Sequence, residues 1–225
     1  YASWNWKANG SGSANTDGTI NSIATSSNAT SGFSIVKYTG NGSTNQTIGH
    51  GLGTVPDFVI VKQTNTTRNW PTYSRAMGNG VTFLDITDAF ASGYTNYFYP
   101  AGMTTTTFGI SDNGNINESG GTYIAYVFSS RTGYSQFGKY TGNGNANGPF
   151  VYTGFKPAWV MTKYATGGSA GGEGWILQDN KRSTYNPSDV FLSPNSSNAD
   201  SVTTNAHLDL LSNGFKLRHL DNRGN

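Results

Sequence analysis

The acidic residues are the first place to look for chemistry in this chain. It has two glutamates, Glu118 and Glu173, and ten aspartates. A glycosidase needs two carboxyl groups about 5 to 10 Å apart across a cleft. Asp85 and Asp88 form the one close pair, and we expect the acidic residues to lie mostly in turns, as the segments Asp112-Asn113-Gly114 and Asp221-Asn222-Arg223 indicate. We therefore predict no catalytic carboxylate pair and expect that the protein is not an enzyme.

Other reactive side chains give no recognisable pattern. His50, His207 and His219 are scattered, without the compact spacing of a zinc site. No Gly-x-Ser-x-Gly segment offers an activated serine. The glycine-rich residues 167–174 lack the lysine of a phosphate-binding loop, and we expect them to form a hairpin tip. These observations predict no catalytic residue, no metal and no cofactor.

Residues 112–118 (Asp-Asn-Gly-Asn-Ile-Asn-Glu) could bind calcium. Oxygen-bearing side chains alternate along this stretch and a glutamate ends it, which are features of calcium loops. The spacing differs from that of an EF-hand, so the alternative is a β-turn that precedes a strand. We favour the β-turn.

Aromatic residues near polar ones are the remaining candidates for binding. Aromatic side chains make up 13% of the chain, and exposed rings of this kind stack on sugars. A recurring Trp also serves as the core anchor of a β-sandwich, so each ring has two interpretations. The candidate glycan-contacting residues are Trp70, Tyr73 and Arg75, together with Trp175 and Lys181 in a matching region.

An internal repeat supplies the elements that would position these side chains. Residues 37–42 (Lys-Tyr-Thr-Gly-Asn-Gly) return as residues 139–144, and residues 55–62 return, with changes, as residues 156–163. Trp70 has its counterpart in Trp175, and the segment beginning at Phe108 has its counterpart at Phe215. The period is about 100 residues, the size of a small domain.

Strand patterns dominate both copies. β-branched and aromatic runs alternate with Gly, Asn and Pro nearly every ten residues, which leaves little room for helices. We predict an all-β protein with two tandem β-sandwich-like repeats, spanning residues 33–133 and 134–225, after a closing strand and a polar linker in residues 1–32. The expected strands begin at Phe33, Gln46, Phe58, Val81, Thr107 and Thr122 in the first copy and at Phe150, Trp159, Trp175, Val190 and Phe215 in the second.

The ends of the chain cut across the repeat. Residues 122–128 close the first copy, the second copy shows no such strand, and residues 1–6 (Tyr-Ala-Ser-Trp-Asn-Trp) look like the closing strand of a preceding unit. One interpretation is that the chain is a fragment of a longer array, whose continuing polypeptide supplies the missing strand. The other is strand exchange, in which Tyr1, Trp4 and Trp6 complete the second unit of a neighbouring molecule and build an open-ended fibre.

Composition narrows the class of protein. Charged residues make up 12% of the chain, the net charge is +2, and there is no cysteine. The charge is too small to indicate nucleic acid as a partner. No apolar run approaches the roughly 20 residues that a membrane helix needs, so we expect no membrane insertion. Uncharged polar residues combined with many aromatic ones favour an extracellular or virion β-protein.

The motifs YTGNG, HGLGTVPDFVIVK and GGTYIAYVF resemble a tandem repeat of phage tail-fibre and virion-appendage proteins, especially of marine and cyanobacterial phages. The resemblance covers nearly the whole chain, although the second copy lacks the segment that contains His50. It implies a non-enzymatic structural and adhesive module of a virion that contributes to host attachment. Its partners would be copies of itself, other virion proteins and a glycan of the host surface. The alternative, based on the aromatic residues, is a lectin-like module of a secreted protein or a subunit of an extracellular fibre.

Overall fold

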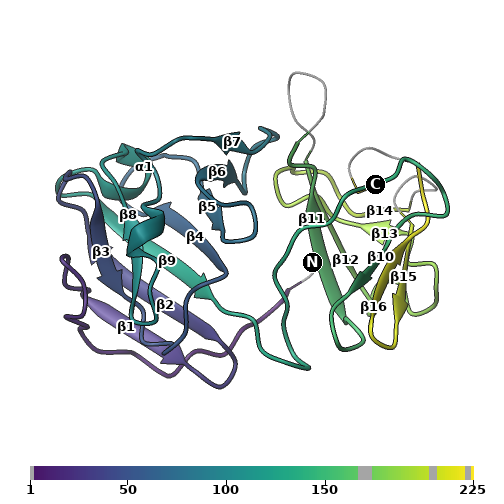
Figure 1. The fold of residues 1–225 in the computed structure, drawn as a ribbon, viewed down its shortest axis with the longest axis horizontal. Coiled ribbons are helices and arrows are strands. Elements are labelled where there is room, and N and C mark those ends of the chain that lie inside the picture. Colours follow the sequence, from purple (N-terminus) through teal and green to yellow (C-terminus); the bar gives the residue numbers. More distant parts are fainter. Residues whose placement is uncertain (1–2, 167–173, 203–206, 221–223) are drawn as a thin grey trace. The chain divides into compact units, whose positions relative to one another are not determined.

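The computed structural model describes residues 3–166, 174–202, 207–220 and 224–225. The protein is all-β, as predicted, with antiparallel strand pairs in several sheets (Figure 1). Helical structure in these residues is confined to the one-turn helix α1 (Gly114–Asn117) and the 3₁₀ turn η1 (Pro100–Gly102). No helix of the described segments is long and apolar enough to cross a membrane.

The chain divides into two compact units. Unit 1 contains Tyr1–Val81 and Ala91–Gly138, and unit 2 contains Thr82–Phe90 and Lys139–Asn225. Each unit is therefore built from two stretches of chain, because the segment Thr82–Phe90 belongs to unit 2.

A seven-stranded sheet forms the main layer of unit 1, and β9 lies in its middle, between β2 and β4 (Figure 1). Alternate residues of β9 are buried, which is the period-2 pattern of a strand with two different faces. In spatial order the strands are β1 (Ala24–Asn28), β2 (Phe33–Thr39), β9 (Thr122–Phe128), β4 (Phe58–Gln63), β5 (Pro71–Ser74), β6 (Gly80–Phe83) and β7 (Ala91–Ser92).

A second, smaller layer closes the core of unit 1. Strands β3 (Gln46–Gly49) and β8 (Thr107–Ile110) pair antiparallel. Phe108 on β8 meets the edge of the Tyr38 ring on β2, with ring centroids 6.2 Å apart, so the two layers pack on each other through aromatic residues. Residues at the centre of this core have no exposed surface: Val36, Tyr38, Ile48, Val59, Phe108, Tyr123 and Val127.

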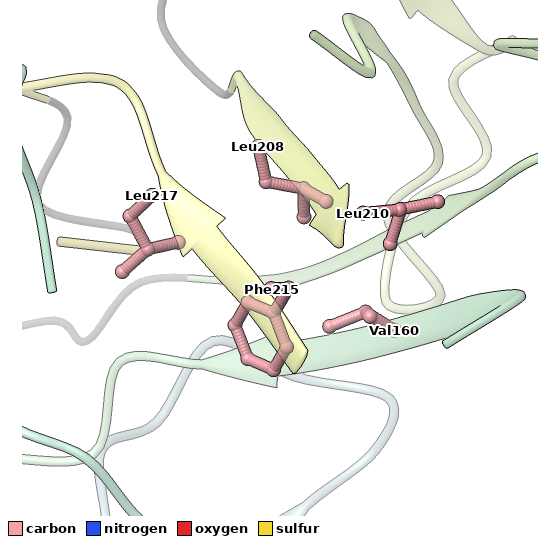
Figure 2. Close-up of a cluster of buried hydrophobic side chains, with 5 residues drawn as sticks. All are labelled: Val160, Leu208, Leu210, Phe215 and Leu217. Atoms are coloured by element: carbon pink, nitrogen blue, oxygen red, sulfur yellow. The ribbon is translucent and has the colours of Figure 1, made fainter. Parts of the chain in front are cut away.

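The described residues of unit 2 form three small sheets around a separate core. Figure 2 shows that core, a cluster of Leu208 and Leu210 on β15, Phe215 and Leu217 on β16, and Val160 on β11. The sheets are β10 (Phe150–Tyr152), β16 (Gly214–Leu217) and β15 (Leu208–Leu211); β11 (Trp159–Lys163) with β12 (Trp175–Asp179); and β13 (Val190–Phe191) with β14 (Ser201–Val202).

The polar stretch before Phe33 differs from the linker that we expected. Residues 24–28 form the edge strand β1, which pairs with β2, and Ile20 pairs with Ile48. The stretch therefore belongs to unit 1. Backbone hydrogen bonds and serine side chains hold it, with the Ser26 hydroxyl donating to the Gly10 carbonyl at 2.7 Å. Such bonds need no hydrophobic pattern, so the sequence gives no signal for this strand.

The amino-terminal segment is not a strand where it is described. Tyr1 lies outside the described residues, and residues 3–9 have an irregular backbone. The Trp6 ring contacts Phe33 and Phe128, with centroid distances of 6.5 and 6.0 Å, and is 41% exposed. In this chain the segment thus covers a pair of aromatic residues of unit 1.

Candidate functional site

The first candidate site is the surface of unit 1 near the predicted sugar-contacting residues. Tyr73 is 4% exposed and packs against Phe98, so its ring is part of the core. Trp70 is half-buried, and the Lys62 amine lies 5.4 Å from the centre of its ring. A cation over the face of an indole is a stabilising contact that also covers that face. Neither ring therefore offers a fully open stacking surface.

Arg75 lies in a different setting, a shallow groove of about 360 Å³ lined by Asp57, Arg75, Ala76 and Phe137. Its guanidinium pairs with the Asp57 carboxylate, and its side chain remains 54% exposed. The other carboxylate oxygen of Asp57 accepts a hydrogen bond from the Ser130 amide at 2.7 Å. The groove thus combines an exposed fork of hydrogen-bond donors with a partly exposed aromatic residue.

The sequence analysis missed Asp57 and Phe137, which complete this groove. The Phe137 ring stacks on Phe58, with centroids 5.8 Å apart and an angle of 11° between the planes. Asp57 is 8% exposed, and its pairing with Arg75 offsets the cost of burying the carboxylate. The sequence contains two weak signals for these residues. Asp57 stands immediately before an apolar strand, and Phe137 is an aromatic residue between two segments that contain glycine. Neither is specific enough to predict a site.

In unit 2 the predicted pair Trp175 and Lys181 does not form a common site. Trp175 is 6% exposed, and its indole N–H donates to the Phe83 carbonyl at 2.7 Å. Lys181 is exposed, and its amide donates to the Asp179 carboxylate at 2.9 Å in a turn. Burial of Trp175 fits the interpretation of this residue as a core anchor.

Lys163 in unit 2 has a partly buried amine with a lowered pKa. Its amine lies 5.5 Å from the centre of the Trp175 ring and donates to the carbonyls of Ile86 and Thr87, each at 3.3 Å. Burial of the amine lowers the pKa of Lys163 from 10.5 to about 8, and the negative charge of Asp88 partly opposes this shift. The lysine therefore fastens the segment Thr82–Phe90 within unit 2.

A buried tyrosine and a buried asparagine organise the turn that follows β2. The Tyr38 hydroxyl donates to the Ile116 carbonyl at 2.7 Å. The Asn117 side chain has no exposed surface; its oxygen accepts from the Asn41 amide at 2.9 Å and its nitrogen donates to the Ser43 carbonyl at 2.8 Å. One side chain thus satisfies two backbone groups of the Gly-Asn-Gly turn.

The same contacts recur in unit 2 with different residues. The Tyr140 hydroxyl donates to the Gly224 carbonyl at 2.6 Å. The Asn225 oxygen accepts from the Asn143 amide at 2.9 Å, and its nitrogen donates to the Asn145 carbonyl at 2.7 Å. Tyr140 also meets Phe215 edge-on at 6.1 Å, as Tyr38 meets Phe108. Asn225 therefore occupies in unit 2 the position of Asn117 in unit 1.

Residues 112–118 form a helical turn rather than the β-turn that we favoured. The Asn113 side chain accepts from the Asn115 amide at 2.9 Å and caps α1. Glu118 binds Gln63 and Arg68, at 2.9 and 3.4 Å, so its carboxylate faces a neighbouring strand and loop. The described residues contain no group of three or more His, Asp or Glu side chains that could hold a metal ion.

His50 has a structural role. It has no exposed surface, its Nδ1 accepts from the Leu52 amide at 3.1 Å, and its Nε2 lies 3.3 Å from the Thr104 carbonyl. Burial lowers the pKa of His50, which favours the neutral ring that this pair of contacts requires. The histidine therefore holds the glycine-rich loop after β3.

Comparison with known families identifies the chain. A family model described as "Domain of unknown function (DUF7483)" matches residues 1–225. The chain belongs to this family. No curated protein and no solved structure matches it. In this DUF7483 chain the Tyr–Asn contacts recur in both units, and Arg75 lines an accessible polar groove.

We predict that Asn117→Ala lowers the free energy of unfolding of unit 1 by about 1 to 3 kcal/mol, because it leaves the Asn41 amide and the Ser43 carbonyl without their partner. Urea denaturation followed by tryptophan fluorescence measures the change. Asn198→Ala, at an exposed position, is the matched control and should change it by less than about 0.5 kcal/mol. Equal effects of the two substitutions would contradict the structural role of Asn117.

Lys163 predicts a pH dependence of the stability of unit 2. Between pH 8 and 10.5 the unfolded chain retains a proton that the folded chain has lost. The free energy of unfolding therefore increases as the pH rises through this window. Below pH 8 the amine is charged in the folded chain as well, and unit 2 is destabilised by the full cost of burying that charge. Lys163→Met removes the contribution. The free energy of unfolding of the wild type relative to this variant should thus increase with pH, and a flat or falling difference would show that the amine is not desolvated.

Proposed function

We propose that this DUF7483 chain is a non-enzymatic structural and adhesive module of a phage tail fibre or virion appendage. The observation that carries the proposal is the recurrence of one network in both units. Tyr38 and Asn117 repeat as Tyr140 and Asn225, with the same backbone acceptors and donors. We infer that the two units are copies of one repeat, of the kind from which extended fibres are built.

The pairs of lysine and tryptophan support the same inference. Lys62, the next-to-last residue of β4, lies over Trp70, and Lys163, the last residue of β11, lies over Trp175. The distances from amine to ring centre are 5.4 and 5.5 Å. Both units thus contain a lysine–tryptophan contact that stabilises the fold, and the recurrence of a stabilising contact favours a structural role. The association with phages rests on the resemblance of the YTGNG and GGTYIAYVF motifs to virion-appendage repeats.

Immunogold electron microscopy tests this proposal directly. Antibodies raised against the purified chain should label the tail or fibres of phage particles whose genome encodes it. Pre-immune serum and particles from a deletion strain are the controls. Antigen that is found in the host lysate and never on purified particles would disprove a role in the virion.

The groove at Arg75 favours a second function, binding of a carbohydrate. An exposed guanidinium offers paired donors to sugar hydroxyls, and the partly exposed Phe137 ring offers an apolar face. This site would let the module contact a glycan of the host surface, or act as a lectin-like module in a secreted protein.

A titration with host-surface oligosaccharides, followed by NMR, checks this function. Arg75→Lys keeps a positive charge beside Asp57 but loses the paired donors, and we expect a loss of affinity of about tenfold. Lys181→Ala, at an exposed lysine outside the groove, should leave the affinity unchanged. Binding that is insensitive to Arg75→Lys would place the sugar elsewhere.

A further inference from the structure

The sheet of β10, β16 and β15 in unit 2 has a buried face and an outer face. Val151 of β10 packs against the hydrophobic core of unit 2, to which Phe215 and Leu217 of β16 also belong (Figure 2). Side chains alternate along a strand, so Phe150 and Tyr152 lie on the outer face of β10. Phe150 is 43% exposed and Tyr152 is 69% exposed. Two large aromatic side chains thus lie on the surface of one short strand.

Strands β10 and β16 correspond to β3 and β8 of unit 1. Ile48 of β3 pairs with Phe108 of β8, and Val151 of β10 pairs with Phe215 of β16. Each of these pairs faces the core of its unit. The residues on either side of Val151 therefore match, in their place on the outer face, the residues on either side of Ile48.

In unit 1 the chain itself covers this outer face. The side chain of Asn15 lies so close to Gly49 of β3 that a Cβ at Gly49 would collide with it. The carbonyl group of Tyr99, just before η1, lies in the same way against Gly109 of β8. The small residues on the outer face of β3 and β8 thus leave room for the covering segments.

In unit 2 the connections that would cover the face are shorter. Leu211 pairs with Gly214, so β15 and β16 are joined by a turn of residues 212–213. In unit 1 the helical turn η1 is inserted at this place, between Phe98 and β8. The stretch between β9 and residue 139 is also much shorter than the polar stretch before β2 that contains Asn15. The exposure of the two rings therefore follows from differences inside the chain.

Charged side chains lie beside the exposed rings. Phe150 pairs across the sheet with Lys216, and Lys216 pairs with Asp209, so these three residues share the outer face. The Lys216 amine donates to the Gly148 carbonyl at 2.7 Å. The Arg218 Nε donates to the Asp209 carboxylate at 2.6 Å, and the Arg218 side chain is 42% exposed. With two cations and one carboxylate, this face has a positive charge.

The area of the aromatic patch suits a small ligand. A Phe or Tyr side chain buries about 150–250 Å² when it is fully covered. At the exposed fractions of Phe150 and Tyr152, the two rings together can bury about 150–300 Å² more. A stable protein interface needs about 800 Å² from each partner. A ligand the size of one or two sugar rings therefore fits this patch better than a protein does.

We propose that the outer face of β10 and β16 is a binding site for an acidic saccharide, a glycan that contains a uronic or sialic acid residue. The apolar face of the sugar ring stacks on Tyr152 and Phe150. The exposed guanidinium of Arg218 pairs with the sugar carboxylate, and Asp209 holds that guanidinium in place. Lys216 adds to the attraction for a negative charge. This inference goes beyond the proposed function, because it uses no residue of the Arg75 groove and holds for a protein of any origin.

NMR titration of the intact chain tests this site. The probes are trigalacturonate, a hyaluronan tetrasaccharide and sialyllactose, with maltohexaose as the neutral comparison. We expect at least one acidic probe to shift the amide signals of Phe150–Tyr152 and Gly214–Leu217, and to bind at least about tenfold more tightly than maltohexaose. Tyr152→Ala should weaken this binding by about three- to tenfold, because it removes a stacking ring. Arg218→Gln should weaken it by about tenfold, because it removes the charged partner of the carboxylate.

Tyr185→Ala is the matched control, since Tyr185 is an exposed tyrosine of unit 2 outside this face. It should leave the affinity unchanged, and so should Arg75→Lys, which tests the groove of unit 1 separately. The Tyr152→Ala result decides even if Arg218→Gln unfolds unit 2, because Tyr152 is mostly exposed.

Three results would overturn the proposal. The first is that none of the acidic probes binds, or that the shifts fall outside β10 and β16. The second is that maltohexaose binds as tightly as the acidic probes, or that Tyr185→Ala weakens binding as much as Tyr152→Ala. The third is a dimer of the intact chain, seen by analytical ultracentrifugation, that Tyr152→Ala dissociates. In that case the aromatic face is an interface between two copies.

Discussion

The central strand β9 is the element on which unit 1 depends. Its backbone pairs with β2 on one edge and with β4 on the other, so one strand of seven residues joins both halves of the sheet. Its side chains also place Tyr123 against Tyr38 and Val127 in the core. Hydrogen bonds along both edges are worth little singly, but each buried group left without one is costly. This strand therefore joins β2 and β4 into one sheet.

The two units share some contacts and differ in others. The Tyr–Asn networks and the lysine–tryptophan pairs, which do not involve a central strand, occur in both units. The units differ at the central strand: among the described residues β11 pairs with β12 alone, and Tyr140 is less buried than Tyr38. The hydrophobic cluster around Leu208 and Phe215 gives unit 2 a core that does not need this strand.

Strands with an apolar or aromatic pattern could be predicted from the sequence, and the internal match of residues 37–42 with residues 139–144 located the counterparts. Two kinds of feature could not. The polar strand β1 is held by backbone and hydroxyl hydrogen bonds, which leave no periodic signal. The Arg75 groove joins Asp57 and Phe137, residues far apart in the chain, and pairing of this kind depends on the fold. The burial of Tyr73 and Trp175 likewise depends on neighbours such as Phe98 and Phe83.

The composition of unit 2 from two stretches of chain has a consequence for folding. Phe83, which accepts the indole proton of Trp175, is made long before the strand that needs it. During synthesis the segment Thr82–Phe90 cannot make this contact until β12 has been synthesised. Folding of unit 2 therefore closes a long loop, and contacts between residues so far apart in sequence slow folding. A polypeptide cut at Gly138 would also leave Trp175 without that acceptor. A cut at Gly138 would thus separate the two stretches of chain that form unit 2.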